Sequence, residues 1–145
     1  MKHSLLILTV IFFIVSCTKK TMTTATTHTP DADFDNTRWK LTRLSGDINL
    51  PKMEDVFVRF DAEKNQVSGK SGCNRFTGQF KLEGNKIQSG PIAMTKMMCP
   101  PELMAVENAF LKVLREMETY SISGDHLKLL KGDMVLAEFE ALYLQ

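Results

Sequence analysis

The sequence predicts an α+β fold built from antiparallel strands and a single helix. Short segments in which apolar and polar residues alternate occupy residues 39–94 and 120–142, and this alternation is typical of strands with one buried face. Between them, one longer segment repeats apolar residues every three or four positions, which indicates an amphipathic helix. Because runs of strands come before and after the helix, the order favours α+β over a repeating βαβ arrangement.

The strands before the helix are expected in residues 39–44, 56–60, 66–69, 76–82 and 87–94. The alternation is clearest in the second of these, where apolar residues occupy every second position. The sequence Glu-Gly-Asn-Lys at 83–86 has the chemistry of a tight hairpin turn. We expect an interruption of the fourth strand near Gly78 and a break or end of the fifth strand at Gly90 and Pro91.

One helix is expected from about Pro101 to Glu118, because Pro is well tolerated at the first helical position. Its predicted buried stripe holds Leu103, Val106, Phe110, Val113, Leu114 and Met117. Its predicted charged face holds Glu102, Glu107, Lys112, Arg115 and Glu116. Antiparallel strands separated by turns are then expected in residues 120–123, 127–130 and 134–142.

The N-terminal segment has the features of an export signal. A basic start, an apolar run from Leu5 to Val15 and a small residue at Ser16 are typical of secretory signals. The run is shorter than the roughly 20 residues that a membrane-spanning helix needs. Because residues 14–17, Ile-Val-Ser-Cys, resemble the bacterial lipobox, we expect removal of residues 1–16 and attachment of a lipid to Cys17. The alternative is an ordinary secretory signal with an incidental cysteine.

Residues 17–36 are expected to form a lipidated, flexible tether, because this stretch is rich in Thr and lacks apolar periodicity. The folded domain is then expected over residues 37–145. Thr18, and not Asp, follows the lipidated cysteine. By resemblance to the sorting rule of Gram-negative bacteria, this predicts an outer-membrane lipoprotein whose domain faces the periplasm. The expected contact with the membrane is the N-terminal lipid.

The charge of the chain argues against one class of partner. The sequence has 18 basic and 17 acidic residues, and Lys2 lies in the signal, so the mature chain is formally neutral. A nucleic-acid interface needs a basic face. We therefore expect no nucleic-acid partner.

The cysteine usage predicts a disulfide. The chain has 3 cysteines, and lipidation of Cys17 would leave Cys73 and Cys99. An even pair in an oxidising compartment is typical of a disulfide, which would stabilise the fold by about 3.5 kcal/mol in the chain-entropy model. The alternative is a pair of buried free thiols, since the distance between the Cα atoms decides whether a bond can form.

Two segments carry a resemblance to a known family. They are Gly72-Cys73-Asn74 with its flanking residues, and residues 95–99, Thr-Lys-Met-Met-Cys. Together with the Trp at the start of the domain they closely resemble the META-domain (HslJ-like) family, over about residues 37–142. The residues that match the family motif are Trp39, Gly69, Gly72, Cys73, Asn74, Phe76, Gly78, Thr95, Met97 and Cys99.

The resemblance implies a compact, β-rich, partly open barrel with a helix packed across it. It also implies that Cys73 and Cys99 lie near each other. Domains of this family resemble lipid-anchored pilotins that assist secretion channels, and the family has no established catalytic activity. We therefore expect neither an enzyme nor a cofactor.

The residues themselves show no convincing catalytic or metal site. A cysteine nucleophile needs a nearby histidine base, and the mature chain offers only His28, in the tether, and His126, beside a turn. The sequence Gly-Lys-Ser at 69–71 lacks the earlier Gly that a phosphate loop needs. The methionines of 94–98 and Met104 leave a copper site open, because soft sulfur ligands select that metal. Since Met is also a common core filler, we expect no metal.

The sequence therefore predicts a non-enzymatic, lipid-anchored module that binds an envelope protein or an apolar ligand, with a link to envelope stress. A groove between a strand and the helix would offer such a site. One alternative is an inhibitor of a secreted protease or muramidase, with loop 69–78 or loop 90–101 as its reactive edge. The other alternative is a thiol or copper protein that uses Cys73 and Cys99.

Overall fold

The computed structural model describes residues 31–46, 48 and 56–143. The predicted signal, Cys17 and most of the predicted tether lie outside these residues. The described elements are strands β1 (Arg38–Leu44), β2 (Phe57–Asp61), β3 (Gln66–Lys70), β4 (Arg75–Glu83) and β5 (Lys86–Met94), helix α1 (Pro101–Glu116), and strands β6 (Thr119–Ser123), β7 (His126–Lys131) and β8 (Met134–Leu142).

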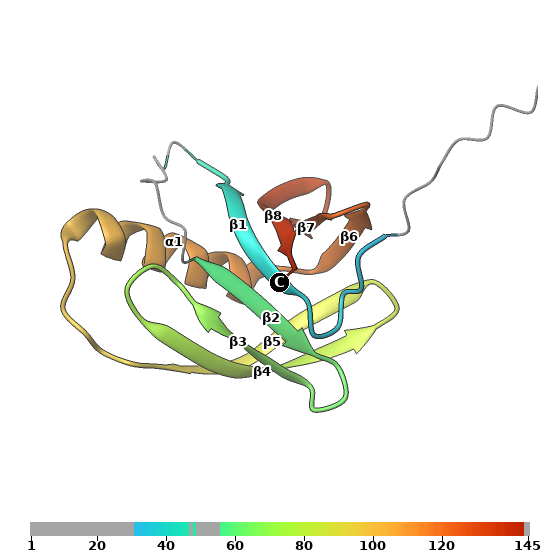
Figure 1. Ribbon diagram of the computed structural model, residues 1–145, viewed down its shortest axis with the longest axis horizontal. Helices are drawn as coiled ribbons and strands as arrows, with labels where there is room; N and C mark the ends of the chain where they lie inside the picture. Colours follow the sequence, from blue (N-terminus) through green and yellow to red (C-terminus); the bar gives the residue numbers. More distant parts are fainter. Residues whose placement is uncertain (1–30, 47, 49–55, 144–145) are drawn as a thin grey trace, which may run out of the picture.

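The strands form one antiparallel ring in chain order, which closes where β8 pairs with β1 from Arg38↔Leu142 to Leu44↔Ala137. The strand pairing is not uniform around the ring. Strands β5 and β6 share a single registered pair, Lys86↔Thr119, and α1 separates them in the chain and lies beside the curved sheet (Figure 1). The predicted α+β class, with a β-rich, partly open barrel and one helix, is confirmed.

Large apolar side chains fill the inside of the ring under α1. Phe110 of the helix lies with its ring centroid 5.7 Å from that of Phe76 and 6.1 Å from that of Phe139. Trp39, Phe60 and Phe110 are fully buried. Aromatic residues bury more apolar area than other side chains do, so these rings hold the helix and the two halves of the sheet together.

The prediction of a break at Gly90 and Pro91 is wrong, because β5 continues through them. Gly78 pairs with Ile92 and Phe80 pairs with Ser89, so β5 has one residue more than β4 between these two pairs. Such a bulge bends a strand without ending it, and it accommodates a Pro that cannot donate to the ladder. The irregularity expected near Gly78 is the other side of the same bulge.

Residues before the predicted domain boundary at residue 37 pack against the core. Ala32 and Phe34 are only 8% and 7% exposed, and the Phe34 ring stacks on Phe60 and on Tyr120. The indole Nε1 of Trp39 donates a hydrogen bond to the Phe34 carbonyl, 3.3 Å away. The last residues of the predicted tether are therefore anchored to the core.

No helix within the described ranges combines the length and the apolar character needed to cross a membrane.

Candidate functional site

The two motif segments meet beside the first half of α1. The turn between β3 and β4 carries Cys73, and the loop after β5 carries Cys99; a disulfide joins them, with their Cα atoms 6.2 Å apart. This bond agrees with the disulfide expected from the cysteine count. It leaves neither residue available as a thiolate nucleophile or metal ligand.

The Asn74 side chain ties the turn to the loop. Its Oδ1 accepts hydrogen bonds from the Thr95 hydroxyl at 2.8 Å and from the Met97 backbone N–H at 2.7 Å. Its Nδ2 donates to the Met97 carbonyl at 3.4 Å and to Glu107 Oε1 at 3.0 Å. Each of the two donors and both lone pairs of the amide has a partner, which is the full capacity of an Asn side chain.

Glu107 of α1 also hydrogen-bonds to this turn, and the predicted position of its side chain is wrong. The prediction put Glu107 on the charged face, but the structure leaves it only 5% exposed. Its Oε2 accepts hydrogen bonds from the Asn74 backbone N–H at 2.9 Å and the Ser71 hydroxyl at 3.1 Å. With the bond from Asn74 Nδ2, a buried carboxylate thus has three donors, which is how proteins offset the desolvation of a buried charge.

The spacing of the helix holds the signal that would have found Glu107. Positions 103, 107, 110 and 114 follow each other at three- and four-residue steps, so Glu107 lies on the same stripe as Leu103, Phe110 and Leu114. A carboxylate inside an apolar stripe indicates a buried polar partner. We refer to Ser71, Asn74, Thr95 and Glu107, with the Cys73–Cys99 disulfide, as the polar clamp.

Two motif glycines are explained by close approach to neighbouring backbone, Gly72 in this turn and Gly69 in β3. Gly72 has φ +130°, and a Cβ there would lie 3.0 Å from the Leu103 carbonyl oxygen of α1. A Cβ on Gly69 would clash with the Phe57 carbonyl oxygen of the paired strand β2. Both positions therefore require Gly, the first for its backbone conformation and the second for space. Trp39 and Phe76 of the motif are core residues.

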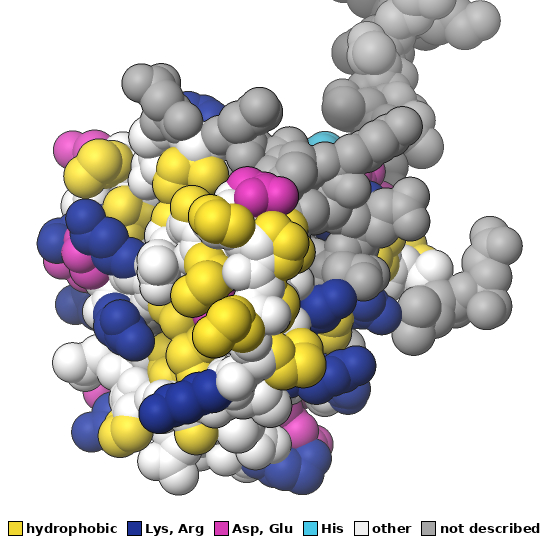
Figure 2. Space-filling view, turned by 90° about the vertical axis from the view of Figure 1, so that its left-hand side faces the viewer, with side chains coloured by type: hydrophobic (Ala, Val, Ile, Leu, Met, Phe, Trp, Pro, Cys, Tyr) yellow, Lys and Arg dark blue, Asp and Glu magenta, His cyan; other side chains and the backbone are white. Residues whose placement is uncertain are grey.

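The polar clamp holds out a loop that carries exposed methionines. Met98 is 97% exposed and Met97 is 56% exposed in the loop, and Met104 of α1 is 41% exposed. Together with half-buried Met94 they line one hollow of about 270 Å³. We call these four residues the methionine face. Figure 2 shows hydrophobic side chains gathered in a band on this side of the molecule, with Lys and Arg side chains around it.

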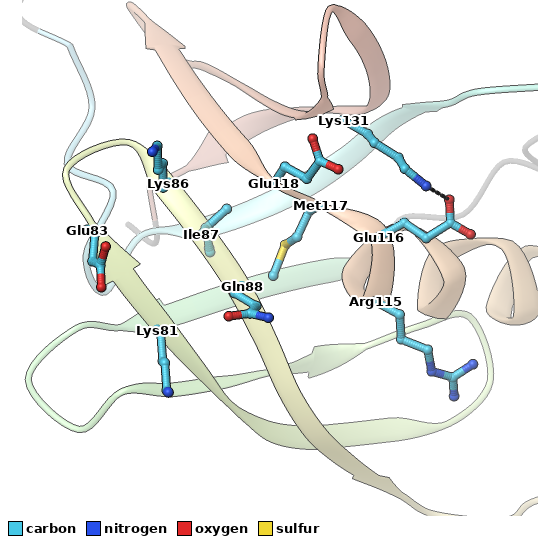
Figure 3. Close-up of a pocket in the computed structure, with 10 residues that line it drawn as sticks. All are labelled: Lys81, Glu83, Lys86, Ile87, Gln88, Arg115, Glu116, Met117, Glu118 and Lys131. Carbon is cyan, nitrogen blue, oxygen red and sulfur yellow. Dashed lines mark hydrogen bonds and ion pairs between the residues drawn. The ribbon is translucent and has the colours of Figure 1, made fainter.

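A second hollow lies between β5 and the C-terminal end of α1, where the ring is narrowly held. It has a volume of about 480 Å³. Ile87 and Met117 lie at its centre, and charged side chains surround them (Figure 3). At its rim, Lys131 Nζ lies 3.2 Å from Glu116 Oε2. This is the expected groove between a strand and the helix, with an apolar centre and a charged rim.

The predicted reactive edge of an inhibitor is not presented at the β3–β4 turn. Ser71, Gly72, Cys73 and Asn74 are all buried, whereas a reactive loop must enter the cleft of its target. Of the two loops named for that role, the structure leaves only the one after β5 exposed.

Two other acidic residues take part in separate local pairs. A hydrogen bond from Lys64 lowers the pKa of Asp61 at the end of β2. A hydrogen bond to Asp125 raises the pKa of Tyr143 near the C-terminus. Among the described residues, no three His, Cys, Asp or Glu side chains gather where they could hold a metal ion.

A closed antiparallel ring, one packed helix and a disulfide-linked Gly-Cys-Asn turn define a small β-barrel domain with a polar clamp. The profile of the META domain matches residues 32–142, and the chain therefore belongs to the META-domain family. The chain is also 35% identical over 75 residues to the heat shock protein HslJ of Escherichia coli (strain K12). That match covers 51% of this chain and 53% of HslJ, so it spans about half of the relative.

Two solved structures share this fold. A protein from Burkholderia xenovorans solved by NMR superimposes with a TM-score of 0.62 at 20% identity, over 77% of this chain and 85% of that one. A second protein solved by NMR has a TM-score of 0.57 at 27% identity, over 73% of this chain and 89% of that one. At 20% identity, the likeness to the Burkholderia xenovorans protein shows the fold alone.

Proposed function

We propose that this chain is a non-enzymatic lipoprotein of the outer membrane, whose META domain faces the periplasm and binds an apolar segment of another envelope protein. The methionine face is the binding surface. The name of the relative, heat shock protein HslJ, supports a role under envelope stress.

The observation that carries the proposal is the exposure of Met98, which is 97%. The loop around it is not loose, because Met97 is hydrogen-bonded to Asn74 through both its N–H and its carbonyl. A loop that is fixed before binding loses less conformational entropy when a partner arrives. Flexible methionine side chains on a fixed backbone adapt to apolar partners of different shape.

Site-specific photo-crosslinking in the full-length, lipidated chain tests the binding surface. A photoreactive residue at position 98 is expected to give an adduct of defined mass in intact cells. The same residue at position 134 is the control, because Met134 is also an exposed methionine (57%) but lies at the start of β8, away from the hollow. Loss of the adduct after Met97→Lys supports the proposal. No adduct at position 98, or the same adducts at both positions, would refute it.

The lipid anchor has its own test. The wild-type chain is expected in the outer-membrane fraction, with a mass that includes the lipid on Cys17. The Cys17→Ser variant is expected to lack that mass and to leave the membrane fraction, since the acyl chains supply the affinity for the bilayer. A wild-type chain without attached lipid would contradict the proposed anchoring while leaving the binding surface untouched.

A further inference from the structure

The methionine face brings together four thioether groups from three parts of the chain. Met94 ends β5, Met97 and Met98 lie in the following loop, and Met104 comes from the first turns of α1. All four line the same hollow of about 270 Å³. Met104 reaches this hollow because the polar clamp holds the loop against the helix. The juxtaposition is therefore a product of the fold and not only of a methionine-rich sequence.

The chemistry of these side chains selects a particular kind of ligand. A thioether sulfur is a soft, neutral donor that favours Cu(I) over hard cations such as Mg²⁺ or Ca²⁺. The cysteine thiols cannot compete for the ion, because the disulfide consumes both. Unlike a thiol or an imidazolium, a thioether carries no proton that must leave before a metal binds.

The charged residues around the hollow limit the charge of the ion that can bind there. Glu107 and Asn74 lie among its lining residues, as does Lys96. The carboxylate oxygens of Glu107 already accept three hydrogen bonds. Glu107 therefore contributes a nearby negative charge and not a ligand, while Lys96 opposes a cation. The one acidic and the one basic group largely cancel, so the hollow lacks the excess negative charge that would attract a hard divalent cation.

We propose that Met94, Met97, Met98 and Met104 form a binding site for the soft monovalent ion Cu(I). This inference goes beyond the proposed function, because it assigns the methionine face a metal as well as a protein partner. The site binds the ion through thioether sulfurs alone. Three of its side chains are exposed enough to turn their sulfur atoms toward a common centre.

The test uses the full chain with methyl-labelled methionine and Ag(I), a redox-inert probe for the Cu(I) site. Ag(I) is expected to shift the methyl NMR signals of the four residues of the methionine face, at a stoichiometry of one ion. The signals of Met117 and Met134 serve as internal controls and are expected to stay in place. Competition with a colorimetric Cu(I) chelator is then expected to show the same single site.

The decisive variant replaces Met97, Met98 and Met104 by Leu, which keeps the apolar surface and removes the sulfur. Its Ag(I) shifts and its competition for Cu(I) are expected to disappear, whereas Met134→Leu is expected to bind as the wild type does. Retained binding in the triple variant, equal shifts of Met134, or the absence of any shift in the wild type would overturn the proposal.

The same substitutions separate this proposal from the proposed function. With the photoreactive residue at position 98, the Met97→Leu and Met104→Leu substitutions are expected to preserve the protein adduct. An adduct without metal binding would reject the metal site alone. Metal binding without an adduct would reject the proposed protein partner alone.

Discussion

The two ends of α1 use polar residues in different ways. At the N-terminal end, buried Glu107 receives three hydrogen bonds from the β3–β4 turn and its Asn74. At the C-terminal end, Glu116 contacts Lys112 and Lys131 at 3.9 Å and 3.2 Å, with all three side chains open to solvent. A buried network fixes one geometry, because any member left unpaired is costly. Exposed ion pairs are screened by water and contribute little.

The hydrogen-bonding side chains of the family motif, Asn74 and Thr95, lie toward the N-terminal end of α1. The motif residues build a fixed backbone from which the methionine face extends. The charged groove at the other end has no comparable cross-links among the described residues. We therefore expect substitutions at the polar clamp to have large effects on the free energy of unfolding and those around the groove to have small ones.

The largest effect is expected for Asn74→Asp. The new carboxylate would lie against that of Glu107, replacing a 3.0 Å hydrogen bond by a repulsion between buried charges. We expect a loss of about 4 kcal/mol in the free energy of unfolding. Urea unfolding followed by the fluorescence of the single, buried Trp39 measures it. Asn85→Asp, in the exposed β4–β5 turn, is the matched control, and an equal loss there would contradict the distinction.

The next effect concerns the disulfide between Cys73 and Cys99, which are 26 residues apart. Replacing both by Ser is expected to lower the free energy of unfolding by about 3.5 kcal/mol, because the unfolded chain regains loop entropy. The urea midpoint of the oxidised wild type and of the variant measures the loss. Reductant should lower the midpoint of the wild type and leave that of the variant unchanged. A wild type insensitive to reductant would contradict a closed disulfide.

A pair of glycine substitutions compares the two ends of the helix directly. Gly72→Ala forces a side chain into φ +130° and toward α1, and we expect a loss of about 3 kcal/mol. Gly132→Ala, at φ +55° with open space around it, is expected to lose only about 1 kcal/mol. Thermal unfolding of both variants gives the comparison. Equal losses would mean that the packing of the turn against α1 contributes nothing.

The smallest effect is expected at the charged groove. A double-mutant cycle with Glu116→Gln and Lys131→Met is expected to give a coupling of about 0.5 kcal/mol or less. The coupling should fall further in high salt, because the side chains are exposed. A salt-independent coupling above about 2 kcal/mol would mean that this ion pair stabilises the fold as a buried pair does. That result would contradict the distinction between the two ends of α1.

Much of the fold follows from local patterns in the sequence. Strands such as β2 bury one face against the core, so their alternation survives in the chain as period two. The helix is recognised for the same reason, because it buries one stripe. The cysteine count favours a link between Cys73 and Cys99 once Cys17 is set aside, but the count alone does not decide between a disulfide and two free thiols.

The wrong predictions share a physical cause, because each of these residues takes its position from partners that are distant in the sequence. Glu107 is buried only because the β3–β4 turn supplies donors to it, and no local pattern contains those donors. Ala32 and Phe34 alternate with three Asp residues, a weak strand-like signal that the polar composition of the preceding tether obscures. Gly90 and Pro91 suggest a strand end, but pairing with β4 carries the strand through them as a bulge.

The central claim is that the polar clamp holds the methionine-bearing loop rigid, and backbone hydrogen exchange tests it most directly. The Met97 N–H donates to Asn74 Oδ1 at 2.7 Å, and the Gly132 N–H donates to the exposed carboxylate of Glu118 at 2.9 Å. We predict that the Met97 amide exchanges only with global unfolding, while the Gly132 amide exchanges through local opening. A Met97 amide that exchanges as fast as that of Gly132 would contradict the claim.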